Sequence, residues 1–571
     1  MLITKKYPEA ITQEYSRRID EIEFSKNGTA DKYRKMNGLL SEMVDLLTND
    51  VPYAMSGTYA KVDYVAGLAP TNVAKRIRML RIRGRRWRVA KQEDERFVES
   101  DIQCLRFVAS MLSGAKNGAE DIDDLPCHAT KPDPERTGAS KEWDVLRIRI
   151  IDGKDTKAVT ASEITDAHER EPITVDLSKY EYMSKWLKTG TRLNLIYHTV
   201  TGSRPQLAMV IYEPDFLVDI TAISTCYTPY TVNQKLFFIK RLLPNQSTKH
   251  TLMGNLAGQF LDESLNDLRH GRDPHTNYRA SAHHFFRTNA LDIASVDGID
   301  AEWHKDAQDQ QTNVAQAMQT LAEHDPYFSP KIAATESSLI CADLGLRGRT
   351  DLMQSDWNFL LEQKSGKMET FSHVGAKEEH YIQMMLYKTM LSVCFGSDND
   401  RSSQYIFYSK YAPSQGLIRE GGSMSEVKTQ EAMRIRNSIV RDMIRYATAS
   451  EIRSDMTSWD IEKFRTRNVS DRLWFPYSKP ELEKALVPIK MADQLTQSYF
   501  FEMLAFEIRE DLESRLGCSS YGRNGFAELW NSDYEDRVSS GNMLIGLQLS
   551  HMTHDEIDDE PGECSIATFK T

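Results

Sequence analysis

The residues best suited to chemistry lie on two neighbouring predicted strands that carry carboxylates and a lysine. The segment LGLRGRTDLM is typical of a strand and contains Asp351, QSDWN is a polar turn, and FLLEQKSGK is typical of a second strand. Side chains alternate along a strand, so Glu362 and Lys364 point to one side, and the hairpin can bring Asp351 beside them. We therefore expect two carboxylates and one ammonium group in a single pocket.

This set of groups suits a divalent cation. Mg²⁺ and Mn²⁺ bind a few carboxylate oxygens and complete their coordination with water and substrate phosphate. We predict that Asp351, Glu362 and the main-chain carbonyl of Gln363 are the ligands. Such a cation lowers the pKa of a bound water, and Lys364 adds positive charge beside the phosphate under attack. The pattern indicates hydrolysis of phosphodiester bonds; an ordinary surface hairpin with solvated charges is the alternative.

A predicted helix over residues 377–393 follows the hairpin. His380, Gln383 and Tyr387 are spaced i, i+3 and i+7, so they lie on one face of this helix, beside an apolar stripe that can pack on the sheet. We expect the polar face to reach the carboxylates. An amphipathic helix without such a role is the alternative.

These segments resemble the PD-(D/E)xK nucleases and, within them, the RecB-like branch. The chain matches the G-x-x-G-x-x-D strand of this branch at 345–351, its E-x-K-[ST]-G-K strand at 362–367 and its E-H-x-x-Q-x-x-x-Y helix at 379–387. The nuclease portion of eukaryotic flap-processing nuclease-helicases and the CRISPR-associated exonucleases are especially similar. The resemblance implies a Mg²⁺- or Mn²⁺-dependent deoxyribonuclease that acts on single-stranded or frayed DNA ends, in repair or in defence against foreign DNA.

The resemblance also implies a role for each matched residue. It implies that Asp351 and Glu362 bind the cation and that Lys364 is catalytic. An acidic residue one strand earlier is a further ligand in this branch, and Glu336 occupies that place. The residues expected to support the site and engage DNA are Gln383 and Tyr387.

The chain departs from the family pattern in one helix. The branch has an upstream G-T-x-x-H helix whose histidine is a metal ligand, but the local counterpart, Gly254 to Gly258, contains no histidine. Because imidazole is optional for Mg²⁺, we expect a water, Asp262 or Glu263 to replace it, with weaker metal binding. A nucleic-acid-binding or scaffolding module with a decayed nuclease site is therefore the alternative function.

The cysteines form the second departure, since many relatives bind an iron-sulfur cluster. The seven cysteines here are scattered without a C-x-x-C motif. We predict no cluster, no zinc site and reduced thiols.

A basic segment near the N-terminus is the candidate nucleic-acid interface. The stretch 75–91 holds nine Lys or Arg residues in seventeen, although the net charge of the chain is -12. Lysine and arginine neutralise phosphates, and tryptophan can stack on an unpaired base. A solvated basic face, balanced by the acidic segment that follows, is the alternative. The predicted contact residues are Lys75, Arg76, Arg78, Arg81, Arg83, Arg85, Arg86, Trp87 and Arg88.

Length and composition indicate a globular chain of several domains, with 571 residues of which 40% are apolar. We expect a mixed α/β (α+β) fold: a helical N-terminal domain (1–125), a small β-rich barrel or sheet (126–225), a PD-(D/E)xK nuclease core (226–450), and a helical C-terminal region (451–571) that leads into a truncated β segment. The segment FLVDITAIS is predicted as a strand that belongs to the β-rich part or opens the nuclease unit.

The remaining sequence features concern location and partners. No apolar run of bilayer length and no signal-peptide core occur, so we expect a cytoplasmic protein without membrane contact. No G-x-x-x-x-G-K-[ST] loop occurs, so this chain is expected to have no ATP site. A helicase motor is therefore expected as a partner, either beyond residue 571 or as a separate chain.

Overall fold

A computed structural model of the chain describes sixteen stretches of the sequence. These are residues 6–55, 57–85, 87, 95, 97–115, 143–164, 172–198, 206–244, 246–274, 278–368, 376–396, 402–420, 426–517, 525–531, 546–555 and 564–570. All structural statements below concern these residues.

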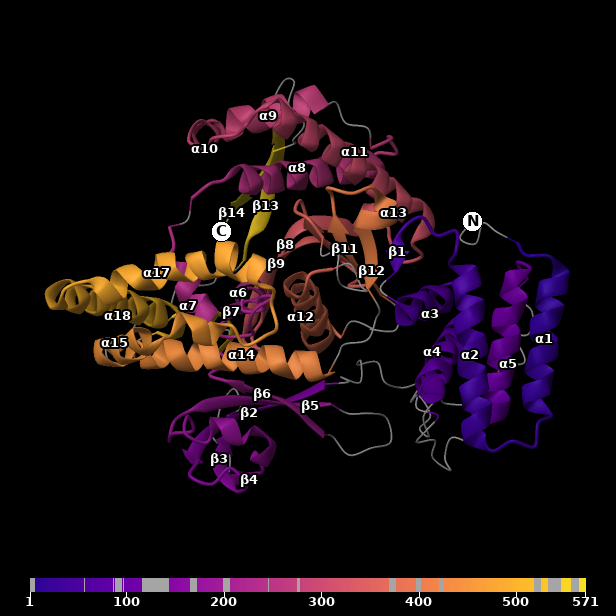
Figure 1. Ribbon diagram of the computed structural model, residues 1–571, viewed down its shortest axis with the longest axis horizontal. Helices are drawn as coiled ribbons and strands as arrows, with labels where there is room; N and C mark the ends of the chain where they lie inside the picture. Colours follow the sequence, from indigo (N-terminus) through magenta and orange to yellow (C-terminus); the bar gives the residue numbers. More distant parts are fainter. Residues whose placement is uncertain are drawn as a thin grey trace.

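A central mixed sheet holds the predicted hairpin (Figure 1). Seven of the described strands form it, in the order β1-β12-β11-β10-β9-β7, with β8 also paired to β9. The pairs β10–β11, β7–β9 and β1–β12 are parallel, and the others are antiparallel. The strands are β1 (Ala54–Met55), β7 (Val218–Asp219), β8 (Ala333–Cys341), β9 (Leu346–Gln354), β10 (Phe359–Lys364), β11 (Ser403–Tyr408) and β12 (Leu417–Glu420).

Helices cover both faces of this sheet, because its apolar side chains alternate between two hydrophobic cores. Leu360 packs in one core with α12 (Glu378–Phe395), and Leu361 packs in the other with α8 (Lys249–Arg269) and α11 (Ala301–His324). Cap residues fix the ends of these helices. The Thr248 side chain accepts the Thr251 N–H at the start of α8, and Gly396, at φ +64°, ends α12. The predicted hairpin and the helix after it therefore form as expected.

The N-terminal helices lie beside the sheet and share the second core with α8 and α11. They are α1 (Glu9–Glu23), α2 (Thr29–Leu47), α3 (Thr58–Gly67), α4 (Thr71–Arg85) and α5 (Val98–Leu112). The short strand β1, between α2 and α3, pairs with the sheet strand β12.

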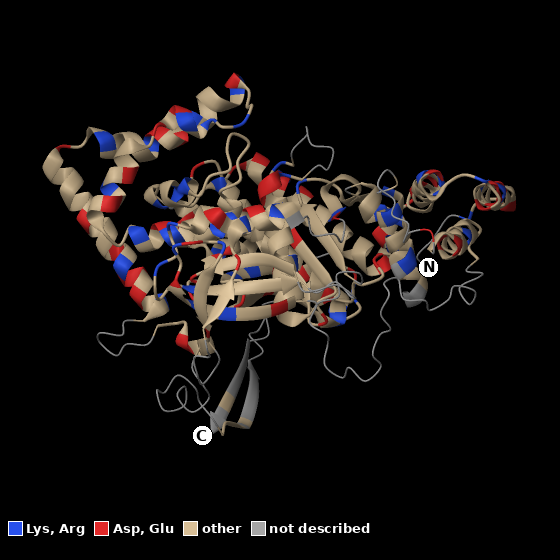
Figure 2. Cartoon of the chain, turned by 90° about the horizontal axis from the view of Figure 1, so that it is seen from below, with Lys and Arg blue, Asp and Glu red and all other residues tan. Residues whose placement is uncertain are grey.

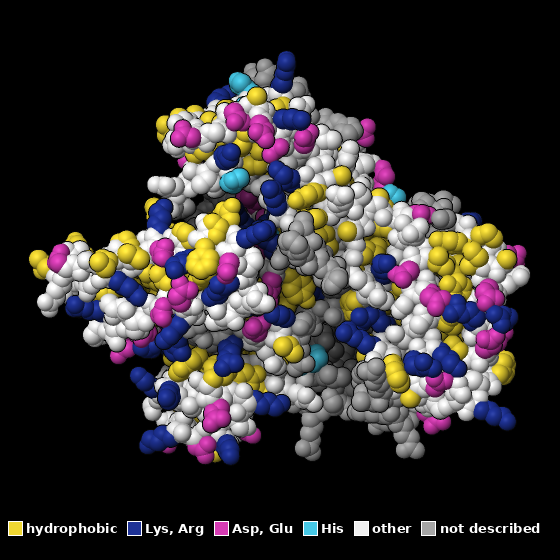
Figure 3. Space-filling view, viewed as in Figure 1, with side chains coloured by type: hydrophobic (Ala, Val, Ile, Leu, Met, Phe, Trp, Pro, Cys, Tyr) yellow, Lys and Arg dark blue, Asp and Glu magenta, His cyan; other side chains and the backbone are white. Residues whose placement is uncertain are grey.

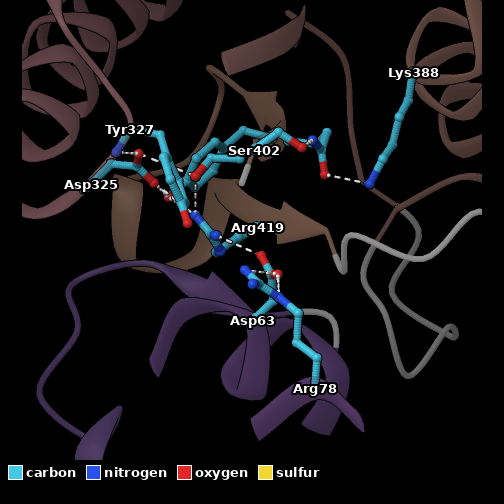
Figure 4. Close-up of polar contacts among 10 residues, drawn as sticks. Asp63, Arg78, Asp325, Tyr327, Lys388, Ser402 and Arg419 are labelled. Atoms are coloured by element: carbon cyan, nitrogen blue, oxygen red, sulfur yellow. Dashed lines mark hydrogen bonds and ion pairs between the residues drawn. The ribbon is translucent and has the colours of Figure 1, made fainter. Parts of the chain in front are cut away.

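A buried ion network joins these helices to the sheet (Figure 4). Arg419 of β12 is fully buried, and its guanidinium lies 2.9 Å from Asp63 of α3 and 2.7 Å from Asp325. Asp63 also pairs with Arg78 of α4 at 3.0 Å, and the Tyr405 hydroxyl donates to Asp325 at 2.6 Å. Charges removed from water in this way need such partners on every side.

The β-rich part is an antiparallel sheet of five described strands in the order β4-β3-β2-β5-β6. Its strands are β2 (Trp143–Asp152), β3 (Val159–Glu163), β4 (Ile173–Val175), β5 (Arg192–His198) and β6 (Gln206–Tyr212). It packs through β6 on α14 (Glu426–Arg445) (Figure 1). The predicted strand FLVDITAIS is wrong beyond its first half, because only Val218–Asp219 extends and Ile220–Ser224 forms α6. Both elements contact the central sheet, ahead of the predicted boundary at 226.

The C-terminal region is helical, and two long helices stand away from the body as a V (Figure 2). The longer described helices are α15 (Ala449–Ser458), α17 (Lys479–Met491) and α18 (Gln494–Leu516). The hairpin of β13 (Gln548–Asp555) and β14 (Cys564–Lys570) forms a separate two-stranded sheet. The shorter helices in the chain are α7 (Lys235–Leu242), α9 (Tyr278–Thr288), α10 (Ala290–Ala294), α13 (Pro413–Gly416), α16 (Asp471–Leu473) and α19 (Glu528–Asn531).

The mixed α/β class is confirmed by these elements. The prediction that all cysteines are reduced thiols is wrong for one pair. Cys341 at the end of β8 and Cys394 in α12 form a disulfide, with Cα atoms 6.1 Å apart. These residues are 53 positions apart in sequence, so no local motif announces the bond. No described helix combines the length and apolar character that crossing a membrane requires.

Candidate active site

Three acidic residues lie in one row across the central sheet. The β9–β10 pairings Leu352↔Leu361 and Met353↔Leu360 continue in register to Asp351 and Glu362. On the other side of β9, the pairings that flank Asp351 place Glu336 of β8 opposite it. Neighbouring strands lie about 4.8 Å apart, so this register gathers three carboxylates. The hairpin geometry expected for Asp351 and Glu362 is present.

Where the main-chain pairing of β9 with β10 ends, a side chain of β9 accepts a main-chain N–H of β10. The Asp351 carboxylate accepts the Gln363 main-chain N–H at 2.6 Å. The Gln363 side chain turns to the opposite face and donates to the Ala257 carbonyl of α8 at 3.0 Å. Asp351 is thus fixed by the strand that carries Glu362. The prediction that the Gln363 carbonyl is a metal ligand stays a prediction.

Glu362 is the most buried carboxylate of the row, with a side chain that is 1% exposed. Its Oε1 atom accepts from the Lys364 ammonium at 2.5 Å and from the Gln383 amide of α12 at 2.6 Å. Its Oε2 atom is buried and receives no N–H donor, while the Asp351 carboxyl lies within hydrogen-bond reach of the Glu362 carboxyl. Burial, together with the nearby charge of Asp351, raises the pKa of Glu362 to about 8. A buried carboxylate oxygen without a donor is costly unless a cation or a proton binds there.

Lys364 lies at the opening of this buried group. Its side chain is 22% exposed, whereas that of Glu362 is closed off from water. Burial acts to lower the pKa of Lys364, but the charges of Glu362 and Asp351 outweigh it, so the pKa lies above its ordinary value. Lys364 is therefore an ammonium at neutral pH, and it supplies charge rather than acting as a base.

Gln383 and Tyr387 support the site from α12, but they do not face a DNA strand. Tyr387 is fully buried, and its hydroxyl donates to the Arg349 carbonyl at 2.6 Å and accepts the Arg349 N–H at 3.1 Å. A Cβ atom at Gly348 would lie 2.7 Å from the Tyr387 ring, which explains the glycine. Gln383 is 7% exposed and donates to Glu362. The predicted DNA contacts of both residues are wrong, because their polar atoms are used inside the protein.

Glu336 adopts an uncommon backbone conformation at the exposed end of the row. Its φ is +50°, which is strained for a residue with a side chain, and strained residues of this kind cluster at functional sites. Its carboxylate pairs with Arg349 at 2.7 Å, and both side chains are more than half exposed. Arg349 is a basic residue that the sequence interpretation missed. Its position two residues before Asp351 on the same strand is the signal that could have found it.

The helix α8 crosses the same row from the other side, along Gly254, Gly258 and Asp262. These residues are four apart, so they share one face of the helix. A Cβ atom at Gly254 would lie 3.5 Å from the Ser365 hydroxyl, which follows β10, while Asp262 interacts with the Thr335 side chain of β8. Gly258 lies between Gly254 and Asp262 along the helix, and a Cβ atom there meets nothing within 4 Å. An open position stands where the resemblance places the family histidine.

Asp262, rather than Glu263, faces the carboxylate row. Loss of water contact raises the pKa of Asp262, and the charges of Glu336 and Asp351 raise it further. Glu263 turns away to α9, where it accepts from the Ser281 hydroxyl at 2.5 Å and from the Gln259 amide at 2.8 Å. Of the expected replacements for the histidine, Glu263 points away from the row, and Asp262 is the side chain that lies near it.

The chemistry of the site fits a hard divalent cation. Among the described residues, no group of three or more His, Cys, Asp or Glu side chains is placed so that it could hold a metal ion. Mg²⁺ and Mn²⁺ keep several waters and need few protein oxygens, so an incomplete cage does not oppose them. The Oε2 atom of Glu362 and the second Asp351 oxygen are the donors available at the row.

The basic segment 75–91 is only partly a surface. Arg76, Arg78 and Arg83 are each less than 5% exposed, and Arg83 pairs with the buried Asp101 at 2.6 Å. The predicted phosphate contacts of these three residues are wrong, since they stabilise the helical bundle. Arg81 is half-buried over the Tyr59 ring, Arg85 is exposed, and Trp87 is half-buried near Arg34. The Lys75 side chain and residues Arg86 and Arg88 lie outside the described part.

Cation binding is expected to strengthen with pH. At pH below about 8 the Glu362 carboxyl holds a proton for much of the time, and a cation must displace it. The Mn²⁺ association constant should therefore rise up to about tenfold per pH unit between pH 6 and pH 8, with a proton released. Calorimetry in buffers of different ionisation enthalpy measures both quantities. Glu362→Gln should remove the proton release; a flat pH profile in the native chain would contradict the assignment.

Filling the open position on α8 is expected to increase metal affinity. Gly258→His places an imidazole at an open position of α8, on the same helix face as Asp262 and where the nuclease resemblance has a histidine ligand. We expect Mn²⁺ to bind about tenfold more tightly, as measured by electron paramagnetic resonance of free Mn²⁺. Gly38→His, at an open helical position of α2, is the matched control and should leave the affinity unchanged. Equal affinities of the two variants would show that α8 does not face the cation.

Comparisons of the whole chain with protein families and with curated proteins find no match.

Proposed function

We propose that this chain is a divalent-metal-dependent nuclease that hydrolyses phosphodiester bonds in DNA. The observation that carries the proposal is Glu362, whose Oε1 is held by Lys364 and Gln383 while its buried Oε2 receives no N–H donor. A buried acid beside a second acid and a lysine is a costly arrangement for a structural role alone. The motifs that resemble the PD-(D/E)xK nucleases place these same three residues together.

The residues divide the work at the scissile phosphate. A bound Mg²⁺ or Mn²⁺ would neutralise phosphate charge and lower the pKa of a water. Asp351 and Glu362 would hold that cation, with Asp262 and Glu336 adding negative charge around it. Lys364 orients the attacking water and stabilises the charge that develops on the phosphate oxygens. Gln383 and Tyr387 keep Glu362 and β9 in place through their buried hydrogen bonds.

The form of the molecule around the site supports a strand or a frayed end as the substrate. In Figure 3, the surface is hollowed between the α8–α11 lobe and α17, and basic side chains border the hollow. Arg349 at the exposed end of the row is placed to meet a phosphate that leaves the site. We propose that this hollow receives a single strand or a frayed end. The helicase that separates such strands is proposed as a partner.

The experiment that tests this function uses the purified chain with DNA labelled at the 5′ or the 3′ end. Single-stranded, frayed and blunt duplex DNA are incubated in Mg²⁺, in Mn²⁺ or in EDTA. We expect products from the first two substrates in the presence of metal and none in EDTA, and the two labels reveal the polarity. DNA binding without products in either metal would contradict the proposal and favour a decayed site.

A further inference from the structure

The helix α18 carries a row of exposed apolar side chains that the fold leaves uncovered. Leu495, Tyr499, Met503 and Phe506 are 80%, 69%, 46% and 50% exposed. Their spacing of four, four and three residues places them on one face of the helix. Met491, at the end of the preceding helix α17, is also 79% exposed. Contiguous exposure of this kind marks an interaction site far more often than single exposed residues do.

The opposite face of α18 already holds the helix on the body. Phe501, Ala505 and Ile508 are buried, and Arg453 of α15 contacts the Ser498 hydroxyl at 3.3 Å. The helix therefore needs no further packing to be fixed. Figure 3 shows hydrophobic side chains gathered on the arm formed by α17 and α18, which Figure 2 shows standing away from the body. The exposed row is accessible along its length.

Most of the charges next to this row are acidic. Glu502, Glu510 and Glu513 lie on the same side of α18 as the row, and all three are exposed. Arg509 lies at the edge of this side, and its guanidinium donates to the Ala447 carbonyl at 2.8 Å. The face is thus apolar in its first half and acidic in its second. Its complement is an amphipathic helix with an apolar stripe flanked by lysine and arginine.

The size of the row also identifies the occupant. From Leu495 to Phe506 the row is about 16 Å long, which matches about three turns of a partner helix. A second copy would bring two acidic halves into one interface. A single basic helix satisfies both the length and the charge.

We propose that the exposed face of α18, from Leu495 to Glu513, is a docking surface for a basic amphipathic helix of a partner protein. The apolar half supplies the contact area, and Glu502, Glu510 and Glu513 select against acidic partners. The surface is separate from the carboxylate row, so the proposal does not depend on nuclease activity.

The test uses two fluorescent helical peptides that share one leucine stripe, flanked by lysine and arginine in the first and by glutamate in the second. Fluorescence anisotropy with the full chain measures both affinities. We expect micromolar binding of the basic peptide and at least about tenfold weaker binding of the acidic one. Equal binding of both peptides, or no binding of the basic peptide, would overturn the proposal.

Substitutions of exposed residues on α18 test whether the peptide binds to this face. Tyr499→Glu with Phe506→Glu should weaken the basic peptide at least about tenfold, and Glu510→Lys with Glu513→Lys about fivefold at low salt. Leu291→Glu, at an apolar residue that is 88% exposed on α10, is the matched control and should change nothing. Because all these side chains are exposed, the melting temperature should stay constant. Sedimentation could instead show that the native chain is a dimer and that Tyr499→Glu with Phe506→Glu abolishes it. The occupant of this face would then be a second copy of the chain, and the proposal would be overturned.

Discussion

Lys364→Ala is expected to reduce DNA cleavage about a thousandfold while the protein stays folded. The ammonium lies 2.5 Å from Glu362 Oε1 and its side chain is 22% exposed, so under the proposed function it supplies positive charge beside the reacting phosphate. Removing one preorganised donor from such a site typically costs 10²- to 10³-fold in rate. The loss of the charge that balances Glu362 adds to that cost.

Single-turnover cleavage of labelled single-stranded DNA, with saturating Mg²⁺, measures this effect. Lys331→Ala is the matched control, because Lys331 is an exposed lysine on the turn before β8 and should leave the rate unchanged. DNA affinity should change by less than about threefold in Lys364→Ala, since one exposed lysine contributes a single phosphate contact. If Lys364→Ala cleaved DNA at the native rate, Lys364 would have no role in the mechanism and the proposed active site would be wrong.

Arg419→Leu is expected to lower the free energy of unfolding by about 3 to 5 kcal/mol. Arg419 is fully buried between Asp63 and Asp325, and it also donates to the Ser403 hydroxyl at 2.5 Å. Leucine fills part of the space but leaves two buried carboxylates without their shared cation. Asp63 still has Arg78 as a partner. Asp325 keeps only neutral hydrogen-bond donors.

Urea denaturation followed by tryptophan fluorescence measures the loss. Arg272→Leu is the matched control, since Arg272 forms a 3.0 Å pair with Asp267 while its side chain is 56% exposed. A surface pair of this kind contributes about 0 to 1 kcal/mol. If Arg419→Leu changed the stability no more than Arg272→Leu, the network would not hold the N-terminal helices on the sheet.

Local sequence pattern predicted the central parts of the site well. The alternation around Asp351 and Glu362 indicated two strands, and the spacing of Gln383 and Tyr387 indicated the helix that packs behind them. The structure has all three elements at these positions. The pattern did not reveal that the helix residues are buried, because the Gly348 contact and the Arg349 main chain that enclose Tyr387 become neighbours only after folding.

The basic segment 75–91 shows where a prediction from local sequence pattern is wrong. Nine positive charges in seventeen residues resemble a phosphate-binding surface, yet Arg78 and Arg83 are buried against Asp63 and Asp101. Asp63 is 15 positions from Arg78 and Asp101 is 18 positions from Arg83, each on another helix. The apolar Ile77 and Leu80 between the arginines, both fully buried, were the sign of a helix face turned inward. The nuclease activity itself stays a proposal that the experiments above decide.

The two-residue strand β1 has a consequence for dividing this protein into parts. It covers the outer edge of β12, so the first helices close the border of the sheet as well as packing beside it. A shortened chain that begins after these helices would present bare main-chain N–H and C=O groups along β12. Open sheet borders of this kind recruit strands from other molecules. Without the first hundred residues, the part of the chain that carries the central sheet is therefore expected to self-associate and precipitate.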